Sequence, residues 1–289
     1  MKLKRFLNDT FLSTLTLISP TLNTKYFYYR RIGKKINLKN PTSFNEKIQW
    51  LKLNVFSKER IYSECADKYK VREYVKKCGC EEILIDLIGV YDDPSEIDFD
   101  KLPNKFVLKW NFGSGLNIVC DDKSKIIEIE VKKKLKKWKR KKFHLRTSEM
   151  HYKYIDKKLI CEKYLDDNIK DYKFYCYNGD VECVMVCFER INGYAKTYYF
   201  DKEWNLLKDY SLDSIEGKDI FEIEKPKLLK KMFDYASIFS KGFPFVRVDL
   251  YYVNNNIYFG ELTFTPYAGL DKTKELLPQQ MADKIKIRK

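Results

Sequence analysis

The pairing of short apolar runs across tight turns constrains the fold of this chain most strongly. Asn178-Gly179, the dipeptide that most favours a two-residue β-hairpin turn, separates two such runs. Two further pairs of runs surround a glycine-containing turn and a row of three asparagines. The three predicted hairpins are 106–110 with 116–120, 173–177 with 181–189, and 246–253 with 257–263.

Helical patterns lie between these hairpins but do not follow every strand. In residues 41–56, Pro41-Thr42-Ser43 precedes apolar residues at helical spacing, which predicts a capped helix. Because helices and strands do not alternate regularly, we expect an α+β fold with antiparallel sheets. Further helices are expected over 67–78, 124–143 and 226–240, and further strands over 83–91, 159–164 and 197–200.

The first 40 residues are predicted to form a separate helical segment. Its apolar stretch at 11–18 is a poor signal peptide, because Asn8, Asp9 and Thr10 interrupt it and no small-residue cleavage site follows. The stretch is also shorter than the roughly 20 apolar residues that span a membrane. We expect a short amphipathic helix that can rest on the inner surface of a membrane.

Basic charge is concentrated in one segment. Lysine and arginine number 56 against 41 acids, a net charge of +15, and residues 132–142 hold nine basic residues and no acid. A solvated helix face is the simplest interpretation of this run, and contact with an anionic membrane or glycan is the next. Trp138 is its only aromatic residue, so base stacking is poorly supported and no nucleic-acid partner is expected.

Eight cysteines raise the question of disulfide bonds. Four of them lie in apolar, strand-like stretches, where a thiol behaves as a small hydrophobe, and no CxxC pair occurs. We therefore expect reduced cysteines in the core of a cytoplasmic protein. The only two histidines, His144 and His151, adjoin the basic run and are expected at the surface, with a place near the site as the alternative for His151.

A first candidate site combines Lys109 with the turn Gly113-Ser114-Gly115. A lysine that closes an apolar strand, followed by small residues, places an ammonium beside free backbone N–H groups, which suits a polyphosphate. On this segment alone, an ordinary hairpin with a surface lysine is the simpler interpretation.

Charged residues inside the last predicted hairpin form a second candidate site. Residues two apart share a face of a strand, so Arg247 and Asp249 point the same way. Glu261 and Thr263 do so for the same reason. If the strands pair, the two acids meet, and two carboxylates with a hydroxyl suit Mg²⁺. A salt-bridged sheet in which Arg247 satisfies both acids is equally compatible with the pattern.

Two charged residues in other strands are less informative alone. Glu162 precedes a polar bend, and Lys173 lies within a predicted hairpin. A solvent-facing position explains each of them.

In their order along the chain, these motifs resemble the ATP-grasp superfamily and, more closely, its TupA-like branch, which is found with bacterial surface polysaccharide and teichuronopeptide genes. The resemblance covers about residues 41 to 267. The matching stretches are TSFNEKIQWLK (42–52), DKYKVREYV (67–75), LPNKFVLKWNFGSG (102–115), CEKYL (161–165), DYKFYCYNG (171–179) and FPFVRVDLYYVNNNIYFGELTFTP (243–266).

The resemblance implies a nucleotide held between two α+β lobes. The implied divisions are an N-terminal helical segment 1–40, a helical and α+β region 41–105, a small lid lobe 106–165 with the basic helix, and a large lobe 166–289 with the metal site. The implied nucleotide contacts are Lys68, Lys109 and Gly113-Ser114-Gly115 for the phosphates, Glu162 and Leu165 for the adenine, and Asp167 or Asn168 for the ribose. The implied metal ligands are Asp249, Glu261 and Thr263, with Arg247 and Lys173 as catalytic residues.

Two positions depart from the family pattern. Thr263 stands where related ATP-grasp enzymes usually carry asparagine, although its hydroxyl still offers an oxygen. Phe112 stands before the glycine turn where the TupA-like branch typically has histidine.

The resemblance implies an ATP- and Mg²⁺-dependent ligase in cell-surface polysaccharide biosynthesis (capsule, O-antigen or teichuronopeptide). Its substrates would be an amine and a carboxylate, such as a uronic acid or amino acid, possibly linked to a sugar nucleotide or lipid. Phosphoryl transfer to the carboxylate would give an acyl phosphate that the amine attacks, which needs no side-chain nucleophile.

Two alternatives come from other functional classes. One is a glycosyltransferase or sugar-modifying transferase of the same pathway, although no Asp-x-Asp motif ends a predicted strand. The other is a nonenzymatic, basic, membrane-associated binding module.

Overall fold

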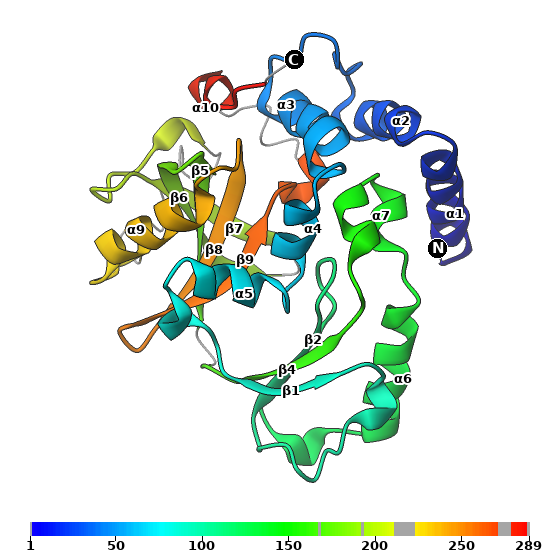
Figure 1. Ribbon diagram of the computed structural model, residues 1–289, viewed down its shortest axis with the longest axis vertical. Coiled ribbons are helices and arrows are strands. Elements are labelled where there is room, and N and C mark those ends of the chain that lie inside the picture. Colours follow the sequence, from blue (N-terminus) through cyan, green and yellow to red (C-terminus); the bar gives the residue numbers. More distant parts are fainter. Residues whose placement is uncertain (1, 167–168, 192–193, 211–222, 271–278, 288–289) are drawn as a thin grey trace.

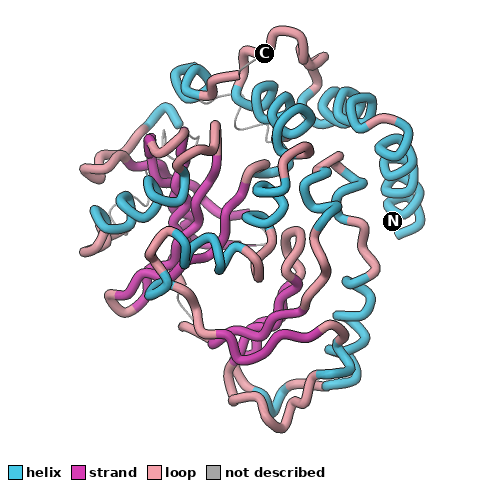
Figure 2. Tube along the Cα trace, viewed as in Figure 1, coloured by secondary structure: helices cyan, strands magenta, loops and turns pink. Residues whose placement is uncertain are grey.

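The computed structural model describes residues 2–166, 169–191, 194–210, 223–270 and 279–287. Its strands form two separate antiparallel sheets with helices around them (Figures 1 and 2), which confirms the expected α+β class. The helices are α1 (Lys2–Ile18), α2 (Pro20–Ile32), α3 (Phe44–Leu51), α4 (Arg60–Ala66), α5 (Val71–Lys77), α6 (Glu128–Lys139), α7 (Phe143–Arg146), α9 (Leu229–Ser240) and α10 (Gln279–Lys284).

The smaller sheet has four strands in the order β1-β4-β2-β3. These strands are β1 (Leu87–Tyr91), β2 (Phe106–Trp110), β3 (Asn117–Cys120) and β4 (Leu159–Lys163). The β2–β3 pairing confirms the first predicted hairpin. β1 comes from the segment before residue 106 and pairs with β4 in this sheet.

The larger sheet has five strands in the order β7-β6-β5-β8-β9. Its strands are β5 (Lys170–Tyr177), β6 (Asp180–Ile191), β7 (Tyr194–Phe200), β8 (Val246–Val253) and β9 (Asn256–Thr263). Both predicted hairpins in this sheet are confirmed. Asn178 has a φ of 52° and Gly179 a φ of 91°, the positive values that a tight hairpin turn of this kind requires.

Alternation along β2 fixes the two faces of the smaller sheet. Phe106, Leu108 and Trp110 are buried on one face, and the Trp110 indole Nε1 donates to the Leu135 carbonyl of α6 at 3.2 Å. Lys109 therefore projects from the opposite face, away from α6. The sheet separates the basic helix from the side that carries the candidate site.

Several predicted elements have different bounds, for local reasons. The capped helix is confirmed: Ser43 and Glu46 form a capping box at the start of α3, but a π-helical turn (Lys52–Phe56) continues it. The helix predicted over 67–78 begins only at Val71, because the Asp67 carboxylate accepts the N–H groups of Tyr69 and Lys70 and forms a turn instead.

Three other predicted segments are shorter or divided. Residues 81–83 form a 3₁₀ turn, so β1 covers only the end of the strand predicted at 83–91. The basic helix predicted over 124–143 is α6 alone, followed by the separate short helix α7. The N-terminal segment contains two helices, α1 and α2, rather than one.

The core is rich in aromatic residues and free thiols. Tyr175 packs against Tyr199 and Phe245 within the larger sheet, and Phe44 of α3 contacts Phe245 edge to face. α9 packs on β5, β6 and β8. All eight cysteines are free and six are buried, as the apolar sequence around several of them indicated.

Candidate functional site

Paired strands β8 and β9 bring the two predicted metal ligands together. Asp249 lies directly opposite Glu261 in the register, which confirms that these acids are neighbours across the hairpin. Arg247 shares their face and donates from Nε and Nη2 to the two carboxylate oxygens of Asp249, each at 2.7 Å. This two-point contact fixes the Asp249 carboxylate in a buried position.

Strand β5 supplies a second cation to the same carboxylate. Lys173 lies opposite Asp249, and its Nζ donates to Oδ2 at 2.8 Å while also contacting the Asp171 carboxylate. Burial alone would lower the pKa of Lys173, but the charges of Asp249 and Asp171 raise it above its usual value. With 9% of its surface exposed, Lys173 does not occupy the solvent-facing position considered from the sequence.

Glu261 is the meeting point of three charged and polar groups. Its Oε2 lies 3.1 Å from the Lys68 Nζ, and its Oε1 accepts from the Thr263 hydroxyl at 3.0 Å and lies 3.8 Å from Arg247 Nη2. Burial opposes ionisation of this carboxyl, but Lys68, Arg247 and Lys173 outweigh burial and lower its pKa to about 2. Glu261 is therefore a carboxylate at neutral pH.

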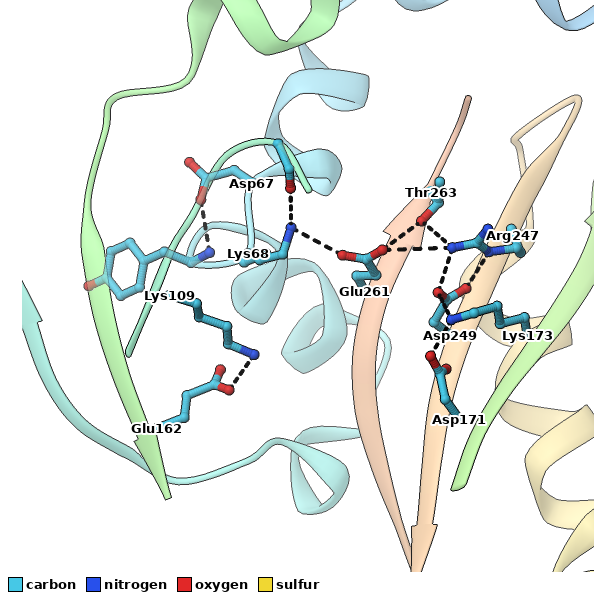
Figure 3. A network of polar contacts seen from close by, with 12 residues as sticks. Asp67, Lys68, Lys109, Glu162, Asp171, Lys173, Arg247, Asp249, Glu261 and Thr263 are labelled. Atoms are coloured by element: carbon cyan, nitrogen blue, oxygen red, sulfur yellow. Dashed lines mark hydrogen bonds and ion pairs between the residues drawn. The ribbon is translucent and has the colours of Figure 1, made fainter. Parts of the chain in front are cut away.

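Lys68 connects the larger sheet to the glycine turn. Its Nζ also donates to the Gly113 carbonyl at 2.8 Å, so one ammonium bridges β9 and the turn between β2 and β3 (Figure 3). Gly113 has a φ of 69°, and a Cβ there would lie 2.6 Å from the Phe143 ring. Only glycine fits this backbone without displacing that ring.

The Asp67 carboxylate shapes the segment that presents Lys68. Besides the two N–H groups of the 67–70 turn, it accepts from the Asn111 side chain at 2.8 Å. The backbone N–H of Lys68 donates to the Asn111 carbonyl at 2.9 Å. Asn111 lies two residues before Gly113, so the same contacts position both the lysine and the turn.

On the smaller sheet, the two remaining charged candidates pair with each other. Lys109 of β2 forms an ion pair with Glu162 of β4, and both side chains are largely buried. Across these adjacent strands Lys109 faces Ile160 and Glu162 faces Val107, so both charges lie on the sheet face opposite α6. Figure 3 shows this pair separate from the Lys68–Glu261 contact.

The other predicted site residues that the structure describes lie in or beside the glycine turn and just after β4. Ser114 is exposed in the glycine turn, and Leu165 is half-buried just after β4. Phe112 is buried beside Trp110, with the Lys157 ammonium 4.7 Å from its ring centre, so it packs within the smaller lobe. Asp167 and Asn168 lie outside the described residues.

Three polar residues near the site were not predicted from the sequence: Asp171, Asp67 and Asn111. Asp171 lies two residues before Lys173 and therefore on the same face of β5, a spacing that would have identified it. Asp67 and Asn111 act through turn hydrogen bonds between distant segments, and their contact has no periodic pattern in the sequence.

His151 corrects another expectation. It is fully buried behind the site among the rings of Phe56, Tyr152 and Phe264, not at the surface. Neither ring nitrogen has a hydrogen-bond partner, and burial, reinforced by the charge of Lys52, lowers its pKa to about 3. It is a neutral core residue.

The oxygen atoms at β8 and β9 are suited to Mg²⁺ that is shared with a phosphate. Within the described part of the chain, no three His, Cys, Asp or Glu side chains are grouped as a metal cage. Mg²⁺ commonly takes one or two carboxylates and completes its shell with water and substrate phosphates. Asp249, Glu261 and the Thr263 hydroxyl fit that pattern, and neighbouring cations neutralise their charge in this structure.

Residues 46–286 match the family described as TupA-like ATPgrasp. The chain belongs to the TupA-like ATP-grasp family. Its two antiparallel sheets with surrounding helices are the ATP-grasp fold that the motifs implied.

Solved structures similar to this TupA-like chain include three enzymes. N5-carboxyaminoimidazole ribonucleotide synthetase with ADP shares 14% identity (TM-score 0.45; 75% of this chain and 49% of that chain). D-alanine–D-alanine ligase from Bacillus anthracis with ATP shares 16% (0.44; 77% and 66%). Biotin carboxylase from Campylobacter jejuni shares 13% (0.44; 80% and 48%). The chain thus spans between about half and two thirds of their lengths, and no curated protein matches it.

Proposed function

We propose that this TupA-like protein is an ATP- and Mg²⁺-dependent ligase that joins a carboxylate to an amine through an acyl phosphate. The single observation that carries the proposal is the arrangement around Glu261: two opposed carboxylates on β8 and β9 lie against a lysine that also contacts a glycine turn. This arrangement combines a divalent-cation site with a phosphate-binding site, as phosphoryl transfer requires.

The phosphate side of the proposed site consists of Lys68, Lys109 and the turn at Gly113-Ser114-Gly115. Their ammonium groups and backbone N–H groups would hold the triphosphate, and Glu162 with Leu165 would contact the adenine. Asp167 would contact the ribose. Holding the γ-phosphoryl group beside a bound carboxylate removes much of the entropic barrier to transfer.

On the metal side, Asp249, Glu261 and Thr263 would hold Mg²⁺, which neutralises charge on the β- and γ-phosphate oxygens when bound. Arg247 would face the transferred group and stabilise the negative charge that develops there. Lys173 has a positioning role in this proposal, because its ammonium is directed at Asp249 and Asp171.

The substrates follow from this chemistry only as classes. We place the enzyme in bacterial cell-surface polysaccharide biosynthesis, on the cytoplasmic side, acting on a uronic acid or amino acid and an amine. An acyl phosphate route predicts ADP and phosphate as products, whereas an adenylate route would give AMP.

The test is incubation with ATP, Mg²⁺ and a panel of uronic acids, amino acids and amines, with ADP, AMP and amide formation measured. We expect ADP together with an amide product. AMP formation, or binding of sugar nucleotides in place of ATP, would contradict the proposed reaction.

Glu261→Gln tests the metal assignment. It should lower ATP turnover by about a thousandfold or more, since a bound metal contributes several kcal/mol of charge stabilisation. Circular dichroism should show an intact fold, and Glu73→Gln, which alters an exposed acid on α5, should retain full turnover. A well-folded Glu261→Gln protein that keeps its turnover would show that Glu261 is not a metal ligand.

A further inference from the structure

The outward face of helix α6 is a basic surface distinct from the candidate site. Side chains spaced three or four apart along the helix line a shallow open hollow on this face. The residues of this basic face are Ile129, Lys132, Lys133, Lys136, Lys137 and Arg140.

The opposite face of α6 anchors the helix to the smaller sheet. Leu135 is fully buried, Val131 and Trp138 pack against the core, and the Trp110 indole donates to the Leu135 carbonyl. Because Lys109 and Glu162 lie on the other side of that sheet, the basic face cannot reach the nucleotide side.

The charge of this face is only partly balanced. Lys136 lies 3.8 Å from Asp93, and Lys132 lies 4.0 Å from Glu128. Among the residues that the structure describes, Lys133, Lys137 and Arg140 have no acidic partner, and all three are exposed. A ligand with several negative charges would therefore be attracted along three turns of the helix.

Exposed apolar side chains accompany this charge at the start of α6. Ile129 is 80% exposed on the basic face, and Ile127 precedes the helix. At the other end, α7 packs on α1, and an Arg146–Asp9 ion pair of 3.0 Å joins these helices. Leu17 and Ile18 at the end of α1 are more than 70% exposed. Figure 1 shows α1 and α6 along the same edge of the molecule.

We propose that the basic face of α6 binds the surface of an anionic phospholipid bilayer, with Ile129 entering the headgroup region. A cluster of lysine and arginine side chains on one helix face is attracted to the negative surface potential of anionic lipids. Trp138 packs against the lobe and is covered by the Lys134 ammonium, so the face offers no exposed aromatic ring for stacking nucleic-acid bases. Among the described residues, no helix is both long and apolar enough to cross a bilayer.

Vesicle sedimentation tests this proposal with the full-length protein. The protein should bind vesicles of phosphatidylcholine with phosphatidylglycerol and remain in the supernatant with phosphatidylcholine alone. Added salt should weaken the binding, because exposed charges are screened. Lys133→Glu with Lys137→Glu should reduce binding at least about tenfold, and Ile129→Ser should reduce it less.

A matched pair of substitutions controls for net charge. Lys227→Glu with Lys230→Glu changes the total charge equally, at and just before the exposed start of α9 on the opposite side of the molecule (Figure 1), and should leave binding unchanged. Equal loss in both double variants, or equal binding of wild type to both vesicles, would overturn the proposal. So would α6-dependent binding of DNA without vesicle binding. ATP binding by thermal shift should be the same in both double variants, which separates this proposal from the ligase proposal.

Discussion

The two sides of the candidate site hold their charges differently. On the larger sheet, Asp249 is contacted by Arg247 at two points and by Lys173, and Lys173 also contacts Asp171. On the smaller sheet, Lys109 and Glu162 form one isolated pair. Lys68 lies between the two sides and contacts both.

The charged groups on the larger sheet are therefore held in a fixed arrangement, whereas the pair on the smaller sheet is free to exchange partners. A carboxylate held by several charge-assisted hydrogen bonds keeps its position whether or not a ligand is present. An ammonium with a single carboxylate partner can exchange that partner for a phosphate at lower cost. We infer that the larger sheet provides the rigid part of the site and that Lys109 changes its partner when nucleotide binds.

Asp249→Asn should have the largest effect on the two-sided arrangement, because it should lower the stability of the protein most. The substitution leaves Arg247 and Lys173 buried with an incomplete partner, and breaking a buried ion pair from one side costs about 3–5 kcal/mol. Urea unfolding measures this loss. Asp156→Asn, which changes an exposed acid paired with Lys70, should cost about 1 kcal/mol or less. A small loss for Asp249→Asn would show that the network is not the rigid part of the site.

Lys109→Met should have an intermediate effect. It leaves the buried Glu162 carboxylate unpaired, at a cost of about 1–3 kcal/mol in unfolding free energy, and removes a proposed phosphate contact. The double variant Lys109→Met, Glu162→Leu sharpens the comparison, because replacing a whole buried pair by apolar residues is often neutral. It should recover stability but still fail to show a thermal shift with ATP. Restored ATP binding would show that Lys109 does not contact the nucleotide.

The pH dependence of Glu261 should give the smallest effect. Because its pKa is lowered from 4.5 to about 2 in the folded protein, its contribution to stability is present above pH 4.5 and is lost as the pH falls toward 2. Because the Glu261 side chain is partly exposed to solvent, its contribution to the free energy of unfolding should be only about 1 kcal/mol. The stability difference between wild type and Glu261→Gln should therefore shrink over this range. Lys68→Met should move the loss to higher pH, because it removes a cation that lowers the pKa.

The hairpins could be predicted from the sequence because their turns and alternation are local. Asn178-Gly179 and the asparagine turn fixed the pairing partners, and strand periodicity then placed Asp249 opposite Glu261. Element ends were harder to predict. The start of α5 depends on the Asp67 carboxylate, which forms a turn that helical spacing alone does not reveal.

The site residues could be predicted as candidates, but their partners could not. The sequence was equally compatible with Arg247 and with a bound metal balancing the charges of Asp249 and Glu261, because both interpretations involve the same residues. The contact of Lys68 with Gly113 joins segments 45 positions apart, and the Lys109–Glu162 pair depends on the β2–β4 register. The burial of His151 likewise depends on tertiary packing, since Phe56 and Phe264 come from distant segments of the chain.

The four-stranded sheet has two faces with different residues, so a substitution on one face need not affect the other. Even-numbered positions of β2 support α6, whereas Lys109 faces the other way. If the basic face of α6 binds membranes as proposed, a substitution on the outer side of α6 would change membrane binding without touching the residues on the other face of the sheet. Relatives in which the outward face of α6 is acidic or neutral would be expected to keep the same reaction and to lose only membrane binding.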